Sequence, residues 1–399
     1  MGAKINRQRL LENLYTQGKI GWEDGEGLQR TAYGENFYSA RSWFCDKMRS
    51  AGLTVSIDPV GNLFGRLCGK TDKTILLGSH LDSVKNGGIY DGSLGIVTAL
   101  ETISSLKENN IPLEHSVEVA AFTAEEGEPL GGTYGSRAFA GLLPENYRSE
   151  EAEKFGITEQ SVKKAKGELS RYAAFLELHI EQGPFLERNN INIGIPSGIV
   201  GITRLRVEII GSANHAGTTP MSERKDAMRT TSFFLHNWFE WMNTQEDMVC
   251  NVGVLNIAPG HVSVIPSNVT FVLEVRSVDS RKIDLACSFA RQLAKKLTEC
   301  KIVISLTGSK PPVLLDSKLI NIIKNCCEAR GLSSAIMPSG ASHDSSPIAH
   351  VIPTGMIFVP SHQGISHAKE EFTSEEDIVR GAELMYDVVR ELDNTLEPV

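Results

Sequence analysis

The stretch "GSHLDSVKNGGIYDGSLG", residues 78–95, joins a predicted strand to a predicted helix. The run before it, "KTILL" (73–77), is mostly apolar, as is typical of a buried strand. The run after it, "GIVTALETISSL" (95–106), has the apolar spacing of an amphipathic helix. A strand that turns directly into a helix is the repeating unit of an α/β fold, so this stretch decides the fold class.

Polar side chains gather in the turn of this stretch. His80 and Asp82 follow the strand, and Asp91 precedes the helix. The glycines of "NGG" and "DGS" allow the backbone to turn tightly enough to return Asp91 to the strand end. Crowded carboxylates repel each other unless a positive group lies among them. The turn therefore suggests a cation site, although a core histidine at 80 and a helix N-cap at 91 are simpler alternatives for each residue alone.

Other segments repeat this pattern of a strand followed by polar residues. Strand-like runs occur at "SVEVAAFTA" (116–124), "AFLELHI" (174–180) and "TGMIFVP" (354–360), with helical spacing between and after them. Such alternation predicts an α/β fold, with a mixed, mostly parallel sheet flanked by helices. In such sheets the chemistry collects at the carboxyl ends of the strands.

Further metal-ligand side chains lie at or after the ends of these strands: Glu125, Glu126, His179 and His367. Adjacent carboxylates are stabilised when one binds a cation and the other takes a proton. Imidazole and carboxylate ligands without sulfur suit Zn, Mn, Co or Ni, and two metals about 3.5–4 Å apart activate a shared water. The residues predict a two-metal site bridged by Asp91, with scattered structural residues as the alternative. Spacing leaves open which glutamate is the ligand and which the general base.

The middle of the chain has a different order of elements, strand–helix–strand–strand–helix–strand. The segments are 203–213, 226–243, 250–258, 269–278, 282–299 and 301–307. This order predicts a ferredoxin-like α+β unit, bracketed by turn-rich stretches at 194–198 and 308–312. We therefore expect an inserted domain within a catalytic, metal-binding domain. The expected boundaries are 1–196 for the first catalytic part, 197–311 for the insert and 312–399 for the second catalytic part.

Composition excludes several classes of protein. A chain of 399 residues with 41% hydrophobic and 22% charged residues is typical of a globular protein, and its length predicts two domains. The net charge of −9 argues against nucleic acid as a partner, and no apolar run approaches the roughly 20 residues that span a membrane. The seven cysteines form no C-x-x-C pair, and the N-terminus lacks a signal-peptide core. Reduced thiols and a cytoplasmic location are the expectation.

Five motifs in order resemble a known family: "GSHLDSV.NGG..DG.LG", "AEEGE", "ELHIEQGP.LE", "NHAGTTPM..R.DA" and "PTGMIFVPS..GISH". Together they resemble the M20 metallopeptidase-like amidases, and more narrowly the hydantoinase/carbamoylase group. This group includes N-carbamoyl-L-amino acid hydrolase, allantoate amidohydrolase and one type of β-ureidopropionase. The resemblance runs from about residue 20 to about residue 390 and implies two divalent metal ions per subunit. It also implies a homodimer whose inserted domain forms the dimer contact and a mobile lid.

The resemblance implies a role for each ligand-type residue. One metal would be held by His80, Asp91 and His179, and the other by Asp91, Glu126 and His367. Glu125 would then be the general base, with the carboxylate of Asp82 orienting His80.

Substrate contacts are also implied by the resemblance. His215 matches a lid histidine that stabilises the oxyanion in the partner subunit's site, and Arg276 matches the arginine that grips the substrate carboxylate. Gln182 matches a substrate contact, and Gly340 and Ala341 lie in a loop that approaches the substrate. From the residues alone, a turn cap at 215, a solvated charge at 276 and a plain loop residue at 182 are the alternatives.

The sequence departs from the family pattern at two positions. Ser263 stands where the family commonly has an asparagine, and Ser342 stands where it usually has a glycine. Serine has a single hydroxyl donor where an amide has two N–H donors, so the substrate-binding position at 263 changes most. Second-sphere candidates His343 and Asp344 are retained.

The sequence therefore predicts a dinuclear metal-dependent amidohydrolase. It would cleave the C–N bond of a carbamoyl or ureido group on a carboxylate-bearing small molecule, an N-carbamoyl-L-amino acid or allantoate, and release ammonia and carbon dioxide. One alternative is an aminoacylase-like or dipeptidase-like M20 hydrolase of an ordinary amide, against which the histidine of "HIEQG" counts. The other is a non-catalytic binding protein that retains the fold.

Overall fold

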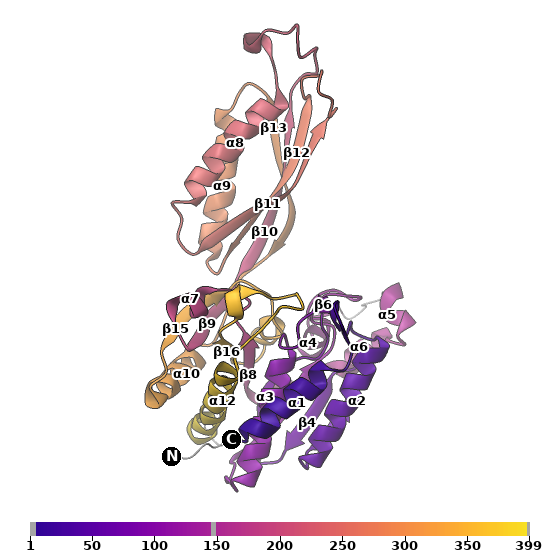
Figure 1. Cartoon of the computed structure of the whole chain (residues 1–399), viewed down its shortest axis with the longest axis vertical. Helices are drawn as coiled ribbons and strands as arrows, with labels where there is room; N and C mark the ends of the chain where they lie inside the picture. Colours follow the sequence, from indigo (N-terminus) through magenta and orange to yellow (C-terminus); the bar gives the residue numbers. More distant parts are fainter. Residues whose placement is uncertain (1–4, 145–148, 397–399) are drawn as a thin grey trace. The chain divides into compact units, whose positions relative to one another are not determined.

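The computed structural model of the protein describes residues 5–144 and 149–396 and divides the chain into two compact units (Figure 1). The larger unit comprises Met1–Ser197 and Leu315–Val399, and the smaller unit comprises Gly198–Leu314. The smaller unit is thus inserted in the sequence of the larger one. Each unit has its own hydrophobic core.

A mostly parallel sheet forms the centre of the larger unit. Its parallel strands are β16 (Thr354–Val359), β8 (Tyr172–Ile180), β5 (Thr71–His80) and β7 (His115–Phe122), in that spatial order. Beyond β7 lie the antiparallel strands β4 (Leu63–Leu67) and β3 (Thr54–Ile57). Beyond β16 lies β9 (Ile193–Ile199), which also pairs with β15 (Ser334–Ser339). Every residue of β7 and β16 is buried, as expected for strands covered on both faces.

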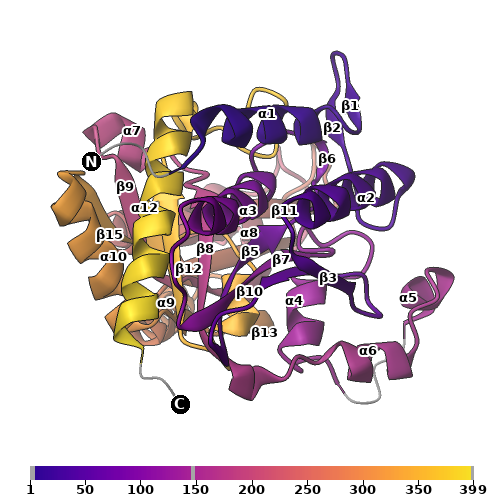
Figure 2. The ribbon, with the colours of Figure 1, turned by 90° about the horizontal axis from the view of Figure 1, so that it is seen from below.

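Helices cover the two faces of this sheet unequally. One core joins the sheet to α1 (Arg7–Gly18), α2 (Glu35–Ser50), α3 (Ser93–Glu108), α10 (Ser317–Arg330) and α12 (Glu375–Thr395). Figure 2 shows α1, α3 and α12 side by side on this face, with α4 (Tyr134–Phe139) on the other. The second face also carries α11 (Ser345–Ile348). Because side chains alternate along β5, Ile75 and Leu77 pack in the first core and Leu76 in the second.

The predicted alternation of strands and helices is confirmed. Elements that the sequence interpretation did not assign are α1, α2, the flanking strands and several short segments. The short segments include β1 (Trp22–Glu23), β2 (Gly27–Gln29), β6 (Lys85–Gly87), α5 (Glu150–Lys154), α6 (Glu159–Ala165) and α7 (Phe185–Asn189). Of these, β1, β2 and β6 form a small separate sheet.

The smaller unit has the predicted ferredoxin-like order of elements. These are β10 (Gly201–Ile210), α8 (Ala227–Met242), β11 (Met248–Ala258), β12 (Asn268–Ser277), α9 (Ser280–Lys296) and β13 (Lys301–Lys310). The sheet order is β11–β12–β10–β13, and all pairings are antiparallel. Both helices cover one face of this sheet (Figure 1), where Phe234 and Trp238 pack against Phe271 and Leu273. The chain returns through β14 (Val313–Leu314), which pairs with the end of β9.

Two features of the whole chain accompany this fold. All seven cysteines are free of disulfide bonds. Among the described residues, no helix has both the length and the apolar character needed to cross a membrane.

Candidate metal centre

The ligand-type residues of the larger unit lie at one edge of its sheet. His80 is the last residue of β5, His179 is the last but one of β8, and Glu125 and Glu126 follow the end of β7. Asp91 lies between β6 and α3. Since β5, β7 and β8 are parallel, their carboxyl ends meet at the same edge.

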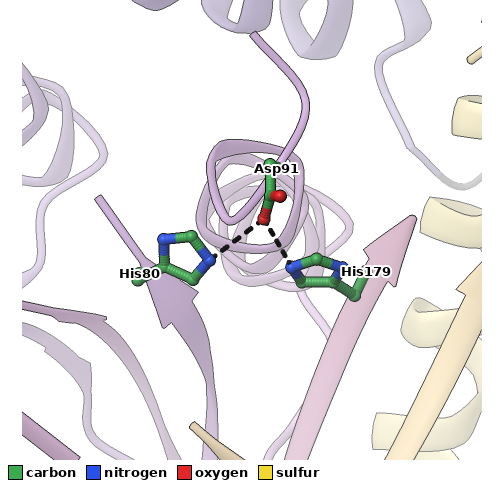
Figure 3. Close-up of side chains that lie close together, drawn as sticks. All are labelled: His80, Asp91 and His179. Carbon is green, nitrogen blue, oxygen red and sulfur yellow. Dashed lines mark ion pairs between the residues drawn. The ribbon is translucent and has the colours of Figure 1, made fainter. Parts of the chain in front are cut away.

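A first group is formed by Asp91 with two histidines, whose rings flank its carboxylate (Figure 3). Oδ1 of Asp91 lies 3.2 Å from Nε2 of His80 and 3.1 Å from Nε2 of His179. All three side chains are buried. The carboxylate therefore faces the Nε2 atom of each ring rather than its Nδ1 atom.

The hydrogen bonds of the two rings test whether this group fits a metal. Nδ1 of His80 lies 2.9 Å from the backbone carbonyl of Asp82, and Nδ1 of His179 lies 2.9 Å from that of Ile180. A carbonyl oxygen only accepts, so each Nδ1 carries a proton, and in the neutral ring the Nε2 lone pair faces the carboxylate of Asp91. The Nε2 lone pairs of the two histidines and the carboxylate of Asp91 are all acceptors that face one another, and a cation between them would stabilise this arrangement. The donor set fits a divalent metal.

A second group shares Asp91 with the first. Oδ2 of Asp91 lies 3.3 Å from Nε2 of His367, and that nitrogen lies 3.4 Å from Oε2 of Glu126. Oε1 of Glu126 is buried and accepts no hydrogen bond from any residue within 5–144 or 149–396. Asp91 thus presents one oxygen to each group, as a bridging ligand does. The orphaned oxygen of Glu126 also fits a metal ligand.

Negative charge is in excess around the two groups. Burial and the neighbouring charge of Asp91 raise the pKa of Glu126 to about 7. Burial also raises the pKa of Glu125 well above its usual value, against the effect of His80. Burial and Glu177 raise the pKa of Asp344 to about 8. Raised pKa values of this kind mean that too little positive charge lies nearby to stabilise the carboxylates. Divalent cations would supply that charge.

Asp82 supports the site differently from the prediction. The prediction has its carboxylate orienting His80, whereas the structure has its backbone carbonyl in that place. The carboxylate instead accepts hydrogen bonds at 3.2 Å from the backbone N–H groups of both Glu125 and Glu126. The reason is geometric, because a side chain two residues after His80 points beyond the strand end toward the next loop. Asp82 therefore fixes the backbone of the two adjacent glutamates.

Gln182 lies at the bridging carboxylate. Its Nε2 atom donates to Oδ2 of Asp91 at 2.7 Å and to Oγ of Ser366 at 3.2 Å. Its backbone has a φ of 56°, a left-handed conformation that directs the side chain out of the line of β8. The structure thus joins Gln182 to the metal groups, and its predicted contact with substrate stays a prediction.

The loop from Ser339 to Asp344 lies beside the first group. The ring of His343 is buried, with its centre 4.4 Å from that of His179. Oγ of Ser339 donates to the carbonyl of Ala341 and accepts from Nε2 of His343. Gly340 is exposed in the same loop. The loop is therefore positioned beside the metal groups through His343.

Residues 76–391 match the family described as Peptidase family M20/M25/M40. The chain belongs to this family. It is 35% identical to the N-carbamoyl-L-amino acid amidohydrolase of Geobacillus stearothermophilus, over 97% of this chain and 99% of that protein. It is 34% identical to the allantoate amidohydrolase of Escherichia coli K12, over 95% of this chain and 96% of that protein.

A solved structure of the same group has a similar fold. An amidase of the hydantoinase/carbamoylase family from Burkholderia multivorans has a TM-score of 0.89 and 30% identity, over 100% of both chains. The predicted family and the predicted class of enzyme are thereby confirmed. This M20 chain is a hydrolase of the amidohydrolase type.

The remaining predicted residues of this M20 hydrolase lie in its inserted unit. His215 is exposed and forms an isolated bridge with Val264. The carbonyl of Ser263 accepts from the backbone N–H of Ala216 at 2.9 Å, so His215 and Ser263 lie on neighbouring segments. Arg276 lies elsewhere on the same unit, on β12, and is paired with Glu274.

Sequence reasoning did not single out Glu371, a buried residue of the M20 site. Glu371 is 4% exposed, and its Oε1 accepts from the backbone N–H groups of Tyr90 and Asp91. The only signal was its place in "GISHAKEEF", four residues after His367. A carboxylate in a loop rich in charged residues is ordinarily solvated, so the sequence alone does not reveal its burial.

Proposed function

We propose that the protein is a dinuclear metal-dependent amidohydrolase. It cleaves the C–N bond of a carbamoyl or ureido group on a substrate that also carries a carboxylate, and releases ammonia and carbon dioxide. The observation that carries the proposal is the position of Asp91, with one carboxylate oxygen in each of two ligand groups. The names of the relatives support the substrate class, because they describe a carbamoyl amino acid and allantoate as substrates.

Two sets of ligands follow from this position. His80, Asp91 and His179 would hold one divalent ion, and Asp91, Glu126 and His367 would hold the other. Zn, Mn, Co and Ni all suit nitrogen and oxygen ligands of this kind. When bound, such ions supply a Lewis acid for the carbonyl and lower the pKa of a nearby water.

Glu125 is proposed as the general base. Its side chain is buried, its pKa is raised by burial, and its backbone is held by Asp82. The carboxylate takes a proton from the attacking water and passes it to the leaving nitrogen as the C–N bond breaks. From an N-carbamoyl amino acid, the products are the amino acid and carbamic acid, which separates into carbon dioxide and ammonia.

The inserted unit is proposed to complete the site and to form a homodimer. Arg276 would bind the substrate carboxylate through its planar guanidinium, and His215 would donate to the oxyanion in the partner subunit's site. Gln182, Gly340 and Ala341 would contact the rest of the substrate. Ser263, with one hydroxyl donor, would select between candidate substrates. The unpaired cysteines favour a reducing compartment, so we place the enzyme in the cytoplasm.

An ammonia-release screen tests this function. The purified protein is assayed with Mn, Co, Ni and Zn, each against allantoate, N-carbamoyl-β-alanine and several N-carbamoyl-L-amino acids. Metal-dependent release of ammonia from at least one of these substrates is expected. If the protein binds no divalent ion and is not activated by one, the proposed metal-dependent catalysis is contradicted. Release of amino acids from N-acetyl amino acids or dipeptides alone would favour the hydrolysis of ordinary amides instead.

A further inference from the structure

Glu371 connects two loops that are 275 residues apart at Asp91 and Ser366. Its Oε1 accepts from the backbone N–H of Tyr90 at 3.1 Å and from that of Asp91 at 3.0 Å. Its Oε2 accepts from the hydroxyl of Ser366 at 2.8 Å. One buried carboxylate therefore binds the backbone that carries Asp91 and the residue that immediately precedes His367.

We propose that Glu371 is a positioning residue that holds Asp91 and His367 at the separation required by the second metal. This inference rests on the proposed function, because it concerns the metal that Asp91, Glu126 and His367 would share. Glu371 itself acts through backbone and hydroxyl groups and is not proposed as a ligand.

The loop that carries His367 needs such support. His367 has a φ of 55°, a left-handed conformation that is strained for a residue other than glycine and is kept by its surroundings. Its side chain is about half exposed, so packing holds it weakly. The neighbouring Ser366 hydroxyl also lies 3.2 Å from Oδ2 of Asp91. Glu371 and Ser366, together with Gln182, thus form the hydrogen-bonded link between the bridging carboxylate and the loop of His367.

The loop before Asp91 is shaped to admit this carboxylate. A Cβ atom at Gly88 would lie 2.4 Å from Cβ of Glu371 and 2.4 Å from its Oε1. Glu371 therefore occupies space that any other residue at position 88 would fill. Since Gly88 does not have a positive φ, an alanine there would act by steric contact and not by backbone strain.

The test compares Glu371→Ala with Glu371→Gln in the full-length protein, by equilibrium dialysis against Mn²⁺ and measurement of bound metal. Glutamine keeps an oxygen for the two backbone N–H groups and presents its NH₂ group to the Ser366 oxygen. We expect Glu371→Ala to bind the more weakly held Mn²⁺ about 10–100-fold less tightly, as is typical when a residue that orients a ligand is lost. Glu371→Gln should retain most of the affinity. In Glu371→Ala, kcat should fall at limiting Mn²⁺ and recover at excess Mn²⁺, with KM little changed.

A matched control is available on the far side of the same unit. Asp393 is also a buried carboxylate that accepts from two consecutive backbone N–H groups, those of Glu114 and His115. Asp393→Ala should lower thermal stability and leave Mn²⁺ affinity unchanged. Equal losses of affinity in Asp393→Ala and Glu371→Ala would overturn the inference, because the effect would then be general destabilisation.

A second variant keeps the inference testable if Glu371→Ala does not fold. Gly88→Ala leaves the chemistry of Glu371 intact but displaces its side chain, and should weaken Mn²⁺ binding in the same way. Gly308→Ala, where an added Cβ meets nothing within 4 Å, is its control. If the parent enzyme is active with two metals and Mn²⁺ affinity is unchanged in both Glu371→Ala and Gly88→Ala, the role of Glu371 is overturned. The proposed function would still stand. A parent that binds no metal would overturn the proposed function instead.

Discussion

The guanidinium of Arg276 forms an ion pair with the carboxylate of Glu274, two residues earlier on β12, with 2.8 Å between Nη2 and Oε1. The other oxygen of Glu274 accepts from Nε of Arg204 on the neighbouring strand β10, at 2.7 Å. Residues two apart on a strand share a face, and Arg204 lies opposite Glu274, so the three charges lie together on one face of the sheet of the inserted unit. Arg276 is thus a cation whose orientation is set by Glu274.

Arg276→Ala should raise KM for carboxylate-bearing substrates with a smaller effect on kcat. The loss of a charge-assisted hydrogen bond predicts a fall in kcat/KM of about 10- to 100-fold. Steady-state kinetics of ammonia release measures it. Arg204→Ala, which removes the other partner of Glu274, is the matched control and should keep KM nearly unchanged. Equal kcat and KM values in the parent enzyme and Arg276→Ala would contradict a role of Arg276 in binding the substrate carboxylate.

Glu125→Gln should abolish turnover and retain metal. The amide cannot take a proton from water, so kcat should fall by about 10²–10⁴-fold, the usual contribution of a general base. The backbone N–H of residue 125 still donates to Asp82 in this variant, so the loop is preserved. Metal content by elemental analysis and substrate binding by calorimetry accompany the kinetics. An active Glu125→Gln enzyme would contradict the assignment of the base.

Asp91→Ala and His179→Ala should differ in metal stoichiometry. Asp91 contributes an oxygen to both groups, whereas His179 belongs to only the first of these two groups. Bound metal per subunit should therefore fall to near zero in Asp91→Ala and by one ion in His179→Ala. Elemental analysis after dialysis measures the ratio. The same loss in both variants would argue against a bridging Asp91.

Gly92→Ala should destabilise the enzyme more than Gly131→Ala. Both glycines have a positive φ, of 65° and 87°, so each alanine costs about 1–3 kcal/mol of backbone strain. At Gly92 the added Cβ would also lie 2.4 Å from the ring of His80, whereas at Gly131 nothing lies within 4 Å. Thermal unfolding and metal content measure the difference. Equal unfolding temperatures in the two variants would mean that the ring of His80 moves away from the added Cβ without a loss of stability.

Removal of metal by a chelator should abolish activity and lower the unfolding temperature. A ligand that binds only the folded protein adds about 2.7 kcal/mol to the free energy of unfolding at 100 times its Kd. Dialysis against chelator, followed by calorimetry before and after Mn²⁺ is restored, measures both effects. An unfolding temperature that does not change with Mn²⁺ would show that the groups around Asp91 bind no ion in the folded state.

The sequence by itself determined the alternation of the main strands and helices, and the polar residues that lie at the strand ends. Apolar periodicity is local, so β5, β7, β8 and the inserted unit could be predicted from their own residues. The positions of His80 and His179 at strand ends followed, because parallel strands end at one edge. The short strands have too few residues for a clear local pattern, and they and the N-terminal helices α1 and α2 were not assigned.

The tertiary structure alone decided how the polar side chains are partnered. It assigned the carboxylate of Asp82 to the backbone of two glutamates, paired Arg276 with Glu274, and buried Glu371 against the loop of Asp91. None of these contacts produces a periodic pattern in the sequence from which it could be predicted. Each depends on distances of a few ångströms between atoms that the whole fold brings together, and on whether burial leaves a charged group without water.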